Sequence, residues 1–281
     1  MDSIKVLVSG AGAPGFYGTY ISLKDNYDNR RVDIVGMDMK DEVFGKYMAD
    51  KFYHIPSAKD DEYLDAVQEI YEKEKIDVFL PQNTDELEKL TGSYMRVAGR
   101  DALANDKSVV YRVAEAVGVP IPKYIELEGR VVIKPFIGHG SKGLHIIENE
   151  EKVIVSEFLE GDEYTVDCFR GDGKFVAIPR RRDEIRNGIS WRTSVVKDDD
   201  LIEWSRRLAE GLHLKYAFGF QFKGGKILEC NPRVQGTMVA STFAGANIIY
   251  SAVKLALKEP IPEFNINWDS KTIRYTICKS V

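Results

Sequence analysis

The segment from Gln221 to Arg233 carries polar groups at the spacing of a metal site. Because successive side chains of a strand point to opposite faces, Glu229 and Asn231 share one face of the predicted strand. Gln221, from the strand before, would complete a set of oxygen ligands that suits Mg²⁺, an ion that takes few protein carboxylates and shares its remaining coordination with water and phosphate. The alternative is a hairpin with ordinary solvent-facing polar residues. The flanking apolar residues and the proline–arginine pair that follows weaken that alternative.

The metal hypothesis requires a particular register of this hairpin. A simple two-residue turn at Gly224 and Gly225 would set Gln221 opposite Leu228, and Gln221 and Glu229 would then point to opposite faces. We therefore predict an odd-numbered loop or a β-bulge between the two strands.

A lysine followed by a glycine-rich loop is the second candidate for chemistry. Lys134 ends an apolar strand, and the loop after it contains Gly138, Gly140, Ser141 and Gly143. The backbone N–H groups of such a loop approach phosphate oxygens closely, and the lysine adds positive charge. The segment does not follow the P-loop pattern. Taken alone, a hairpin with a solvated lysine explains it equally well.

Two charged segments give weaker signals. Acidic residues surround Gly161, and such a run is by itself typical of a solvated face. Basic residues gather further on, where Arg180, Arg182 and Arg186 precede Gly188 and Ser190. Because arginine binds carboxylates in a bidentate manner, this cluster slightly favours a small carboxylate or amino acid as substrate over a solvated basic surface.

The first glycines of the chain match the pattern G-x-G-x-x-G. Gly10, Gly12 and Gly15 follow a predicted strand, and Asp38 lies at about the distance of an acid that binds a ribose hydroxyl. The motif alone suggests a dinucleotide site and hence a nicotinamide-dependent oxidoreductase. We favour the simpler interpretation, a tight turn between strand and helix, because Pro14 removes one backbone donor and the motif explains nothing beyond the first forty residues.

The elements that must position these groups fall into two patterns. Apolar runs at 4–9, 32–37 and 76–81 alternate with helical periods at 18–24 and 63–73, which predicts a parallel α/β sheet. A helix capped near Asn105–Asp106 begins a second pattern. Short strands at 131–158 indicate a small β-rich lid. The strands 164–169, 217–222 and 226–231, with helices 200–212 and 247–257, indicate an antiparallel α+β unit.

Composition limits the class of protein. The 281 residues suffice for two domains, and 44% of them are hydrophobic and 30% charged. The net charge of −5 makes nucleic acid an unexpected partner, and no apolar run approaches the length of a membrane span. We expect a cytoplasmic protein whose three cysteines form neither a disulfide framework nor a zinc site.

In this order, the segments resemble the ATP-grasp superfamily, in particular its carbamoyl-phosphate-synthetase-like and amino-acid ligase branches. The resemblance covers nearly the whole chain. It depends on Lys107 before the Gly118–Pro122 segment, on Lys134 with its glycine loop, on Glu157 to Glu163, and on Gln221 to Arg233. It implies a Rossmann-like domain at 1–103 and an ATP-grasp domain at 104–281, with the lid at about 109–159.

The resemblance also implies roles for single residues. Lys107 and Lys134 would contact the ATP phosphates, and the glycine loop would close over them. Glu157, Phe158 and Leu159 look like the hinge that meets adenine, and Glu163 looks like the acid that accepts the ribose hydroxyls. Gln221, Glu229 and Asn231 would hold Mg²⁺, or Mn²⁺ in its place, and Arg233 would lie near the transferred phosphoryl group. Gln221 stands where many members carry an acid, so the metal site has one fewer negative charge.

The function that follows is an ATP- and Mg²⁺-dependent carboxylate–amine ligase acting through an acyl phosphate. Its substrates would be a small carboxylate and an amine, and a homodimer is compatible with the sequence. Two alternatives remain open: the nicotinamide-dependent oxidoreductase, and an ATP-binding regulatory protein without turnover.

Overall fold

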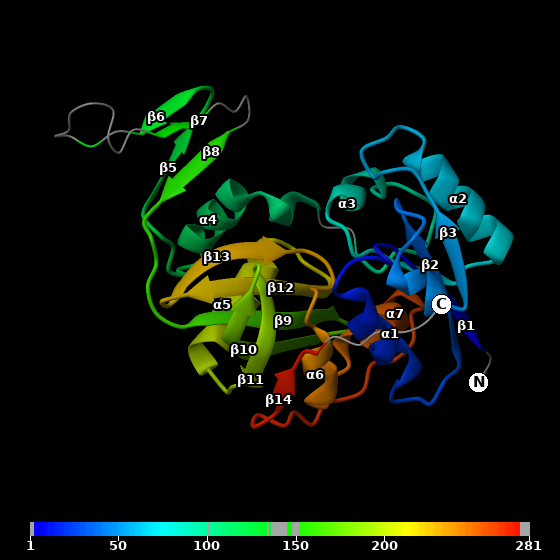
Figure 1. Ribbon diagram of the computed structural model, residues 1–281. Coiled ribbons are helices and arrows are strands. Elements are labelled where there is room, and N and C mark those ends of the chain that lie inside the picture. Colours follow the sequence, from blue (N-terminus) through cyan, green and yellow to red (C-terminus); the bar gives the residue numbers. More distant parts are fainter. Residues whose placement is uncertain (1–2, 100–101, 134, 136–144, 148–151, 276–281) are drawn as a thin grey trace.

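The computed structural model describes residues 3–99, 102–133, 135, 145–147 and 152–275. Its N-terminal part, in blue and cyan in Figure 1, is a four-stranded parallel sheet in the order β3-β2-β1-β4. The strands are β1 (Ile4–Val8), β2 (Val32–Asp38), β3 (Lys51–His54) and β4 (Val78–Leu80). The helical segments are α1 (Phe16–Lys24), η1 (Phe44–Tyr47), α2 (Tyr63–Glu74) and α3 (Asp85–Lys89).

Both faces of this parallel sheet are covered, which explains why its strands are continuous apolar runs. Leu7 and Phe79 pack against α2 on one face. Val6 and Ile34 face the other way and belong to a core that also contains residues of α1 and of a C-terminal helix, α7 (Ile248–Ala256). One hydrophobic core therefore extends across both halves of the chain.

The C-terminal part is a six-stranded antiparallel sheet in the order β13-β12-β9-β10-β11-β14. Its strands are β9 (Glu163–Gly171), β10 (Lys174–Arg186), β11 (Ile189–Val195), β12 (Tyr216–Lys223), β13 (Lys226–Asn231) and β14 (Lys271–Ile273). The helical segments around it are η2 (Ala102–Asn105), α4 (Lys107–Ala116), α5 (Asp199–Gly211), α6 (Val239–Phe243) and α7.

The two faces of this sheet differ in chemistry. One face, with Phe218, Phe220 and Phe222, packs against α4 and α5. The other face joins the shared core through Phe169 and Ile178 at one end and carries charged and amide side chains at the other. This polar end forms the candidate site.

Two small antiparallel sheets of two strands each project from the body between α4 and β9 (Figure 1). They pair β5 (Tyr124–Leu127) with β8 (Val153–Ser156), and β6 (Val131–Ile133) with β7 (His145–Ile147). The predicted lid at 109–159 included most of α4, but Val110 and Ala114 of that helix pack in the core of the body. We therefore propose that the lid is the segment 124–156. The predicted domain boundary at 103/104 falls within η2 and remains a prediction.

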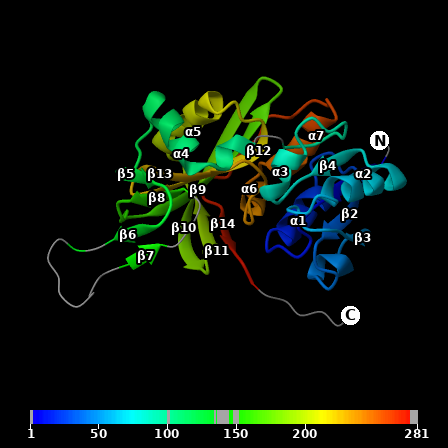
Figure 2. The ribbon, with the colours of Figure 1, turned by 90° about the horizontal axis from the view of Figure 1, so that it is seen from above.

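The α/β and α+β parts appear in the predicted order. Helix α4 begins as expected, because the Asp106 side chain accepts hydrogen bonds from the backbone N–H groups of Ser108 and Val109. Seen from above in Figure 2, α4 and α5 lie on one side of the large sheet. None of the described helices is long and apolar enough to cross a membrane.

Candidate active site

The hairpin of β12 and β13 has the register that a shared polar face requires. Lys223 pairs with Lys226 across the turn, but Gln221 pairs with Glu229 and not with Leu228. The extra residue on β13 forms a β-bulge, so the predicted register is confirmed. The bulge lets the apolar side chains of both strands stay buried on the far face while Gln221 and Glu229 stand opposite each other on the polar face.

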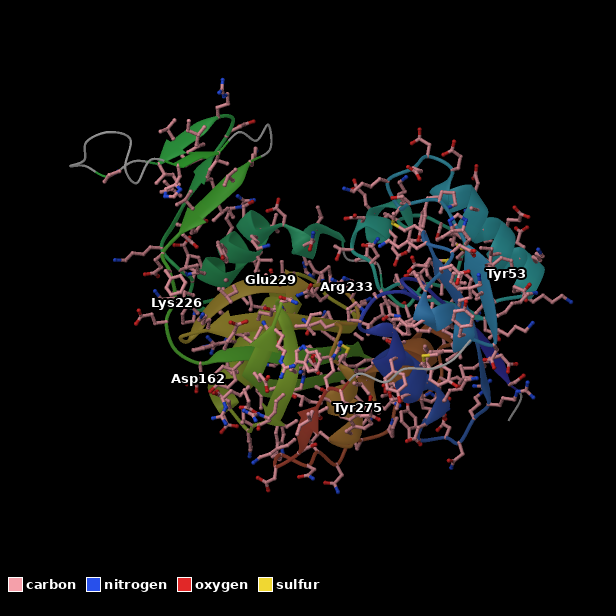
Figure 3. The ribbon with its side chains drawn as sticks, viewed as in Figure 1. Tyr53, Asp162, Lys226, Glu229, Arg233 and Tyr275 are labelled. Atoms are coloured by element: carbon pink, nitrogen blue, oxygen red, sulfur yellow. The ribbon has the colours of Figure 1, made fainter. Side chains whose placement is uncertain are left out.

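Glu229 lies in a row of polar groups that runs from α4 toward the N-terminal domain. Lys107 Nζ is 3.3 Å from Glu229 Oε2, and Asn231 donates to Glu229 Oε1 at 3.2 Å. Arg233 donates in turn to Asn231 Oδ1 at 3.4 Å. Figure 3 shows Glu229 and Arg233 near the middle of the molecule, with Lys226 at the other end of β13. Cations therefore stand on both sides of the carboxylate.

Arg233 connects this row to the N-terminal domain. Its Nε donates to Thr84 Oγ1 at 2.8 Å, and its Nη1 donates to the backbone carbonyl of Val234 at 3.1 Å. Burial lowers the pKa of Arg233, whereas the nearby carboxylates of Glu86, Glu229 and Asp85 raise it. The guanidinium is thus held in a partly dehydrated position, where its charge acts more strongly on an anion than it would in water.

A second network centres on Arg182 of β10. Its Nη1 bonds the carboxylate of Glu163 and donates to Gln221 Oε1 at 3.1 Å. Its Nε donates to Ser190 Oγ at 2.9 Å, and its Nη2 donates to the carbonyl of Gly188 at 2.5 Å. The network brings Glu163 and Gln221 together. It also occupies the nitrogen atoms of Arg182, which leaves this arginine little capacity for a substrate.

The predicted hinge follows β8, at the point where the chain passes from the lid to the body. The Glu157 carboxylate bonds Lys226 of β13, and Glu157 exchanges hydrogen bonds of 2.9 Å with the backbone of Lys123. The bond from Lys226 lowers the pKa of Glu157. Phe158 is 85% exposed, and the ammonium of Lys223 lies 5.3 Å from the centre of its ring. Leu159 is partly buried. The lid is therefore attached to the tip of the β12–β13 hairpin by an ion pair and an aromatic contact.

The residues of the glycine loop are not described. Lys134, Gly138, Gly140, Ser141 and Gly143 lie outside the described residues, so their roles remain predictions from the sequence.

A chemical test of the metal hypothesis is whether the donor set suits Mg²⁺. Glu229 supplies one carboxylate, and Gln221 and Asn231 supply amide oxygens from the same face. No group of three His, Cys, Asp or Glu side chains suited to a metal occurs in the part of the chain that the structure describes. One carboxylate with two amides suits an ion that keeps water and phosphate ligands, so the residues fit Mg²⁺ and its binding remains a prediction.

Two of the predicted substrate contacts must be corrected. Arg180 is fully buried, and its Nε and Nη2 donate to the carboxylate of Asp167 at 2.6 and 2.7 Å. An arginine closed off from solvent in this way joins β10 to Asp167 of β9, which also accepts from Ser241 of α6, and it does not meet a substrate. Arg186 lies near the tip of the β10–β11 hairpin, where it stacks on Trp191 at 4.2 Å and pairs with Glu184. Neither of these contacts connects Arg186 to the row around Glu229.

The structure adds two groups that the sequence analysis did not single out. Gln235 is buried over Gly219, and its amide has no hydrogen-bond partner among the residues that the structure describes. Arg274, beyond β14, donates to the carbonyl of Gly236 at 2.8 Å, and burial lowers its pKa. Both lie next to the turn after Arg233. The only sequence signal for Gln235 was its place two residues after Arg233.

The glycine motif after β1 does not form a dinucleotide site. Ala13 donates to the Gly10 carbonyl, and Gly10 has a φ of +63°, so the first glycine makes the tight turn. A Cβ on Gly15 would lie 2.8 Å from the Cα of Gly236. The backbone of the C-terminal half thus occupies the start of α1, where a pyrophosphate would have to bind.

Comparisons with known proteins agree with this architecture. Residues 149–278 match the sequence model of the family described as ATP-grasp in the biosynthetic pathway with Ter operon. Residues 7–99 match the model of the PylC-like N-terminal domain. No curated protein matches the chain.

Solved structures show the same fold at low identity. Biotin carboxylase from Campylobacter jejuni, in a complex with β-γ-ATP, is 17% identical, with a TM-score of 0.68 over 94% of this chain and 73% of that chain. N5-carboxyaminoimidazole synthetase from Staphylococcus aureus, complexed with ADP, is 16% identical, with a TM-score of 0.66 over 97% and 81%. The L-amino acid ligase from Bacillus licheniformis is 10% identical, with a TM-score of 0.65 over 91% and 74%. The chain therefore combines a PylC-like N-terminal domain with an ATP-grasp domain, and as a whole it has the fold of these solved structures.

Proposed function

We propose that this protein is an ADP-forming carboxylate–amine ligase that uses ATP and Mg²⁺ and proceeds through an acyl phosphate. One observation carries the proposal: the bulged hairpin sets Glu229 opposite Gln221, and Lys107 and Arg233 stand on either side of Glu229. An anionic nucleotide with its cation requires this combination of oxygen ligands and flanking positive charges.

The reaction follows from the weakness of a carboxylate as an electrophile. A carboxylate oxygen of the first substrate forms a bond to the γ-phosphorus, and the bond between that phosphorus and the β-γ bridging oxygen breaks to release ADP. The amine nitrogen then forms a bond to the acyl carbon, phosphate leaves, and the nitrogen loses a proton. Bound Mg²⁺, or Mn²⁺ in its place, neutralises charge on the phosphates, and Glu229, Gln221 and Asn231 would hold it.

Arg233 has the position to stabilise the transferring phosphoryl group. Its guanidinium is partly dehydrated and fixed by Thr84 from the N-terminal domain, so it need not reorganise as charge develops. Lys107, at the start of α4, contacts Glu229 from the other side and would meet the phosphates there. In this structure Lys107 pairs with Glu229 and Arg233 Nη2 donates to Asn231. We expect these two contacts to exchange for phosphate contacts when ATP binds, while the bond from Arg233 Nε to Thr84 stays.

The adenosine end of ATP would lie beneath the hairpin lid. Glu157 to Leu159 leave the lid beside β13, and Ile125, Val132 and Ile146 of the lid are each more than half exposed to solvent. Apolar side chains on a projecting hairpin suit contact with a base. Glu163 would accept the ribose hydroxyls once its contact with Arg182 rearranges.

We place the carboxylate substrate beside Gln235 and Arg274. A buried amide without a partner among the described residues and a partly buried arginine adjoin the turn that follows Arg233. A carboxylate there would accept hydrogen bonds from both side chains, which would satisfy the amide nitrogen of Gln235. A small carboxylate or amino acid fits this proposal. We further propose that the enzyme acts in the cytoplasm, and a homodimer is compatible with the reaction.

The test is a screen of small carboxylates and amino acids for stimulated release of ADP and phosphate. Hydroxylamine, a small nucleophile that needs no acceptor site, should convert the acyl phosphate into a hydroxamate. ATP binding without ADP release for any carboxylate would favour the ATP-binding regulatory protein. ADP release without trapped hydroxamate would count against the acyl phosphate.

A further inference from the structure

A cavity of about 570 Å³ lies in the N-terminal domain, outside the row of groups around Glu229. It is lined by the turns that follow three strands of the parallel sheet: Ser9 and Gly10 after β1, Asp38 at the end of β2, and Gln82 and Asn83 after β4. The chain leaves β1 in one direction toward β2, while β4 pairs on the other side of β1. Ligands of open α/β sheets bind at this kind of crevice, at the carboxyl ends of the strands.

The cavity adjoins the candidate active site. Asn83 lines it, and the next residue, Thr84, accepts the hydrogen bond of Arg233 at 2.8 Å. Glu86 also lines the cavity, and its carboxylate lies close enough to raise the pKa of Arg233. A molecule in the cavity would therefore have one end near the arginine that faces the transferred phosphoryl group.

Three acids and one base line the cavity, and two of the acids are already matched by their surroundings. Glu42 has a counter-charge, because its carboxylate accepts hydrogen bonds from the ammonium of Lys46 at 2.8 Å and from the hydroxyl of Tyr47 at 2.7 Å. Glu86 likewise accepts from the hydroxyls of Ser9 and Tyr63 and from a backbone N–H.

Asp38 differs from both of these acids, because it forms no ion pair with the residues that the structure describes and it is only partly buried. Each of its oxygens accepts a single backbone N–H, from Gly12 at 2.8 Å and from Lys40 at 2.9 Å. A carboxylate oxygen accepts a second hydrogen bond, so Asp38 can still bind a donor. Lys40 is the one base among the cavity-lining residues that the structure describes, and it is exposed.

Part of the wall is apolar. Val43, Phe44, Ile55 and Pro56 contribute aliphatic and aromatic surface, and the backbone N–H of Ile55 donates to the carbonyl of Asp38 at 3.0 Å, so this surface adjoins the Asp38 end. Such a wall suits an aliphatic chain and disfavours a bare sugar or a phosphate. The cavity would therefore accept a ligand that has a positive group at one end and a methylene chain attached to that group.

We propose that this cavity binds the amine acceptor of the ligase, and that the acceptor is a diamine-like molecule: a reacting amine on an apolar chain whose second, cationic amine binds Asp38. The proposal rests on the proposed ligase function and names the class of its second substrate. Asp38 is a specificity determinant here, because it holds the end of the molecule that does not react.

The experiment measures binding of two probes of equal chain length by ligand-observed NMR: 1,5-diaminopentane and n-pentylamine. A charge-assisted hydrogen bond to Asp38 should give the diamine about tenfold or more higher affinity for the parent protein. Asp38→Asn should remove that preference. Met39→Lys places a cation on the same wall at a side chain that is 56% exposed, so it tests the site even if Asp38→Asn does not fold. Glu42→Gln is the matched control, and we expect the preference to survive in it.

The outcomes separate the two proposals. Equal affinity of the parent for the two amines, or a diamine preference that survives both Asp38→Asn and Met39→Lys, would overturn the acceptor assignment. Absence of carboxylate-dependent ADP and hydroxamate in the parent would overturn the ligase function instead, because hydroxylamine needs no acceptor cavity. Amide formation with 1,5-diaminopentane at a lower KM than with n-pentylamine, lost in Asp38→Asn, would support both.

Discussion

Replacing Glu229 with Gln separates the structural role of this carboxylate from its chemical role. The substitution keeps the shape of the side chain and removes one negative charge. In the structure, Glu229 pairs with Lys107 at 3.3 Å, and the two side chains are 31% and 51% exposed. An ion pair as exposed as this one contributes about 0.2–1 kcal/mol to stability. The amide can still accept from Asn231, so we expect the free energy of unfolding to fall by less than about 1 kcal/mol.

The catalytic effect should be much larger than the structural one. Glu229 is the one carboxylate in the proposed set with Gln221 and Asn231, so its loss leaves the metal site with amides only. A metal ion that is lost or misplaced cannot neutralise charge during phosphoryl transfer. We expect carboxylate-dependent ADP release to fall a hundredfold or more, which corresponds to about 2.7 kcal/mol or more in the barrier. An increase in the activation free energy that exceeds the loss in the free energy of unfolding would indicate that Glu229 acts as a metal ligand.

The assay compares the parent with folded Glu229→Gln in Mg²⁺, using a carboxylate from the screen and hydroxamate formation as the readout. A second readout needs no substrate: the gain in ATP affinity on adding Mg²⁺ over EDTA should shrink in the variant. Glu263→Gln is the control. Glu263 forms an ion pair of 2.5 Å with Lys174, and its own side chain is exposed and takes no part in the site. Near-parental turnover with an unchanged Mg²⁺ effect would refute the assignment of Glu229 as a metal ligand.

Three further predictions test other parts of the argument. Asp167→Asn should lower the free energy of unfolding by about 3–5 kcal/mol, because it leaves the buried Arg180 without a counter-charge, and the double variant Asp167→Leu with Arg180→Met should lose less stability. Urea unfolding midpoints, compared at a constant m value, measure these losses, and a loss under about 1 kcal/mol for Asp167→Asn would contradict the prediction. Burial raises the pKa of Glu86, so folding favours its protonated form and stability should fall as pH rises from the ordinary value of 4.5 through the raised folded pKa. Glu86→Gln should flatten this part of the pH profile, and an identical profile would refute the reasoning. Lys134→Met should weaken ATP binding at equal thermal stability, and unchanged affinity would exclude a phosphate contact.

Regular periodicity explains which elements the sequence predicted. The apolar period of residues 63–73 and 200–212 predicted α2 and α5, because each helix buries one side. Alternation within 226–231 identified the shared face of Glu229 and Asn231. The long strands β10 and β11 were missed, because Arg180 to Arg182 read as a basic cluster and not as a strand with one arginine buried and another in a network.

Contacts between distant segments set the limit of that prediction. The pairing of Arg182 with Glu163 and Gln221 depends on the register of β10 on β9 and of β9 on β12, which no local pattern specifies. The same holds for Arg180, whose partner Asp167 lies on a neighbouring strand. Thr84 was not predicted as a partner of Arg233, because it comes from the other domain. The hairpin register could be predicted, because the requirement and the two strands lie within one short segment.

The packing of the two domains determines which part of the site is able to move. The parallel sheet, α1 and α7 share one hydrophobic core, and Gly15 lies against Gly236 so closely that a side chain would not fit between them. This interface holds Thr84 against Arg233 and fixes the acceptor cavity relative to the phosphoryl-transfer site. Of the lid, Tyr124 and Ile154 at its base pack against the core of the body, whereas Ile125, Val132 and Ile146 are more than half exposed. Near Glu157 the contacts with the body are a partly exposed ion pair and an aromatic contact. We therefore expect ATP binding to move the lid while the cavity and Arg233 keep their relative positions. The acceptor site would then be formed before the nucleotide binds, and the lid would close after the nucleotide has bound and exclude water from the acyl phosphate.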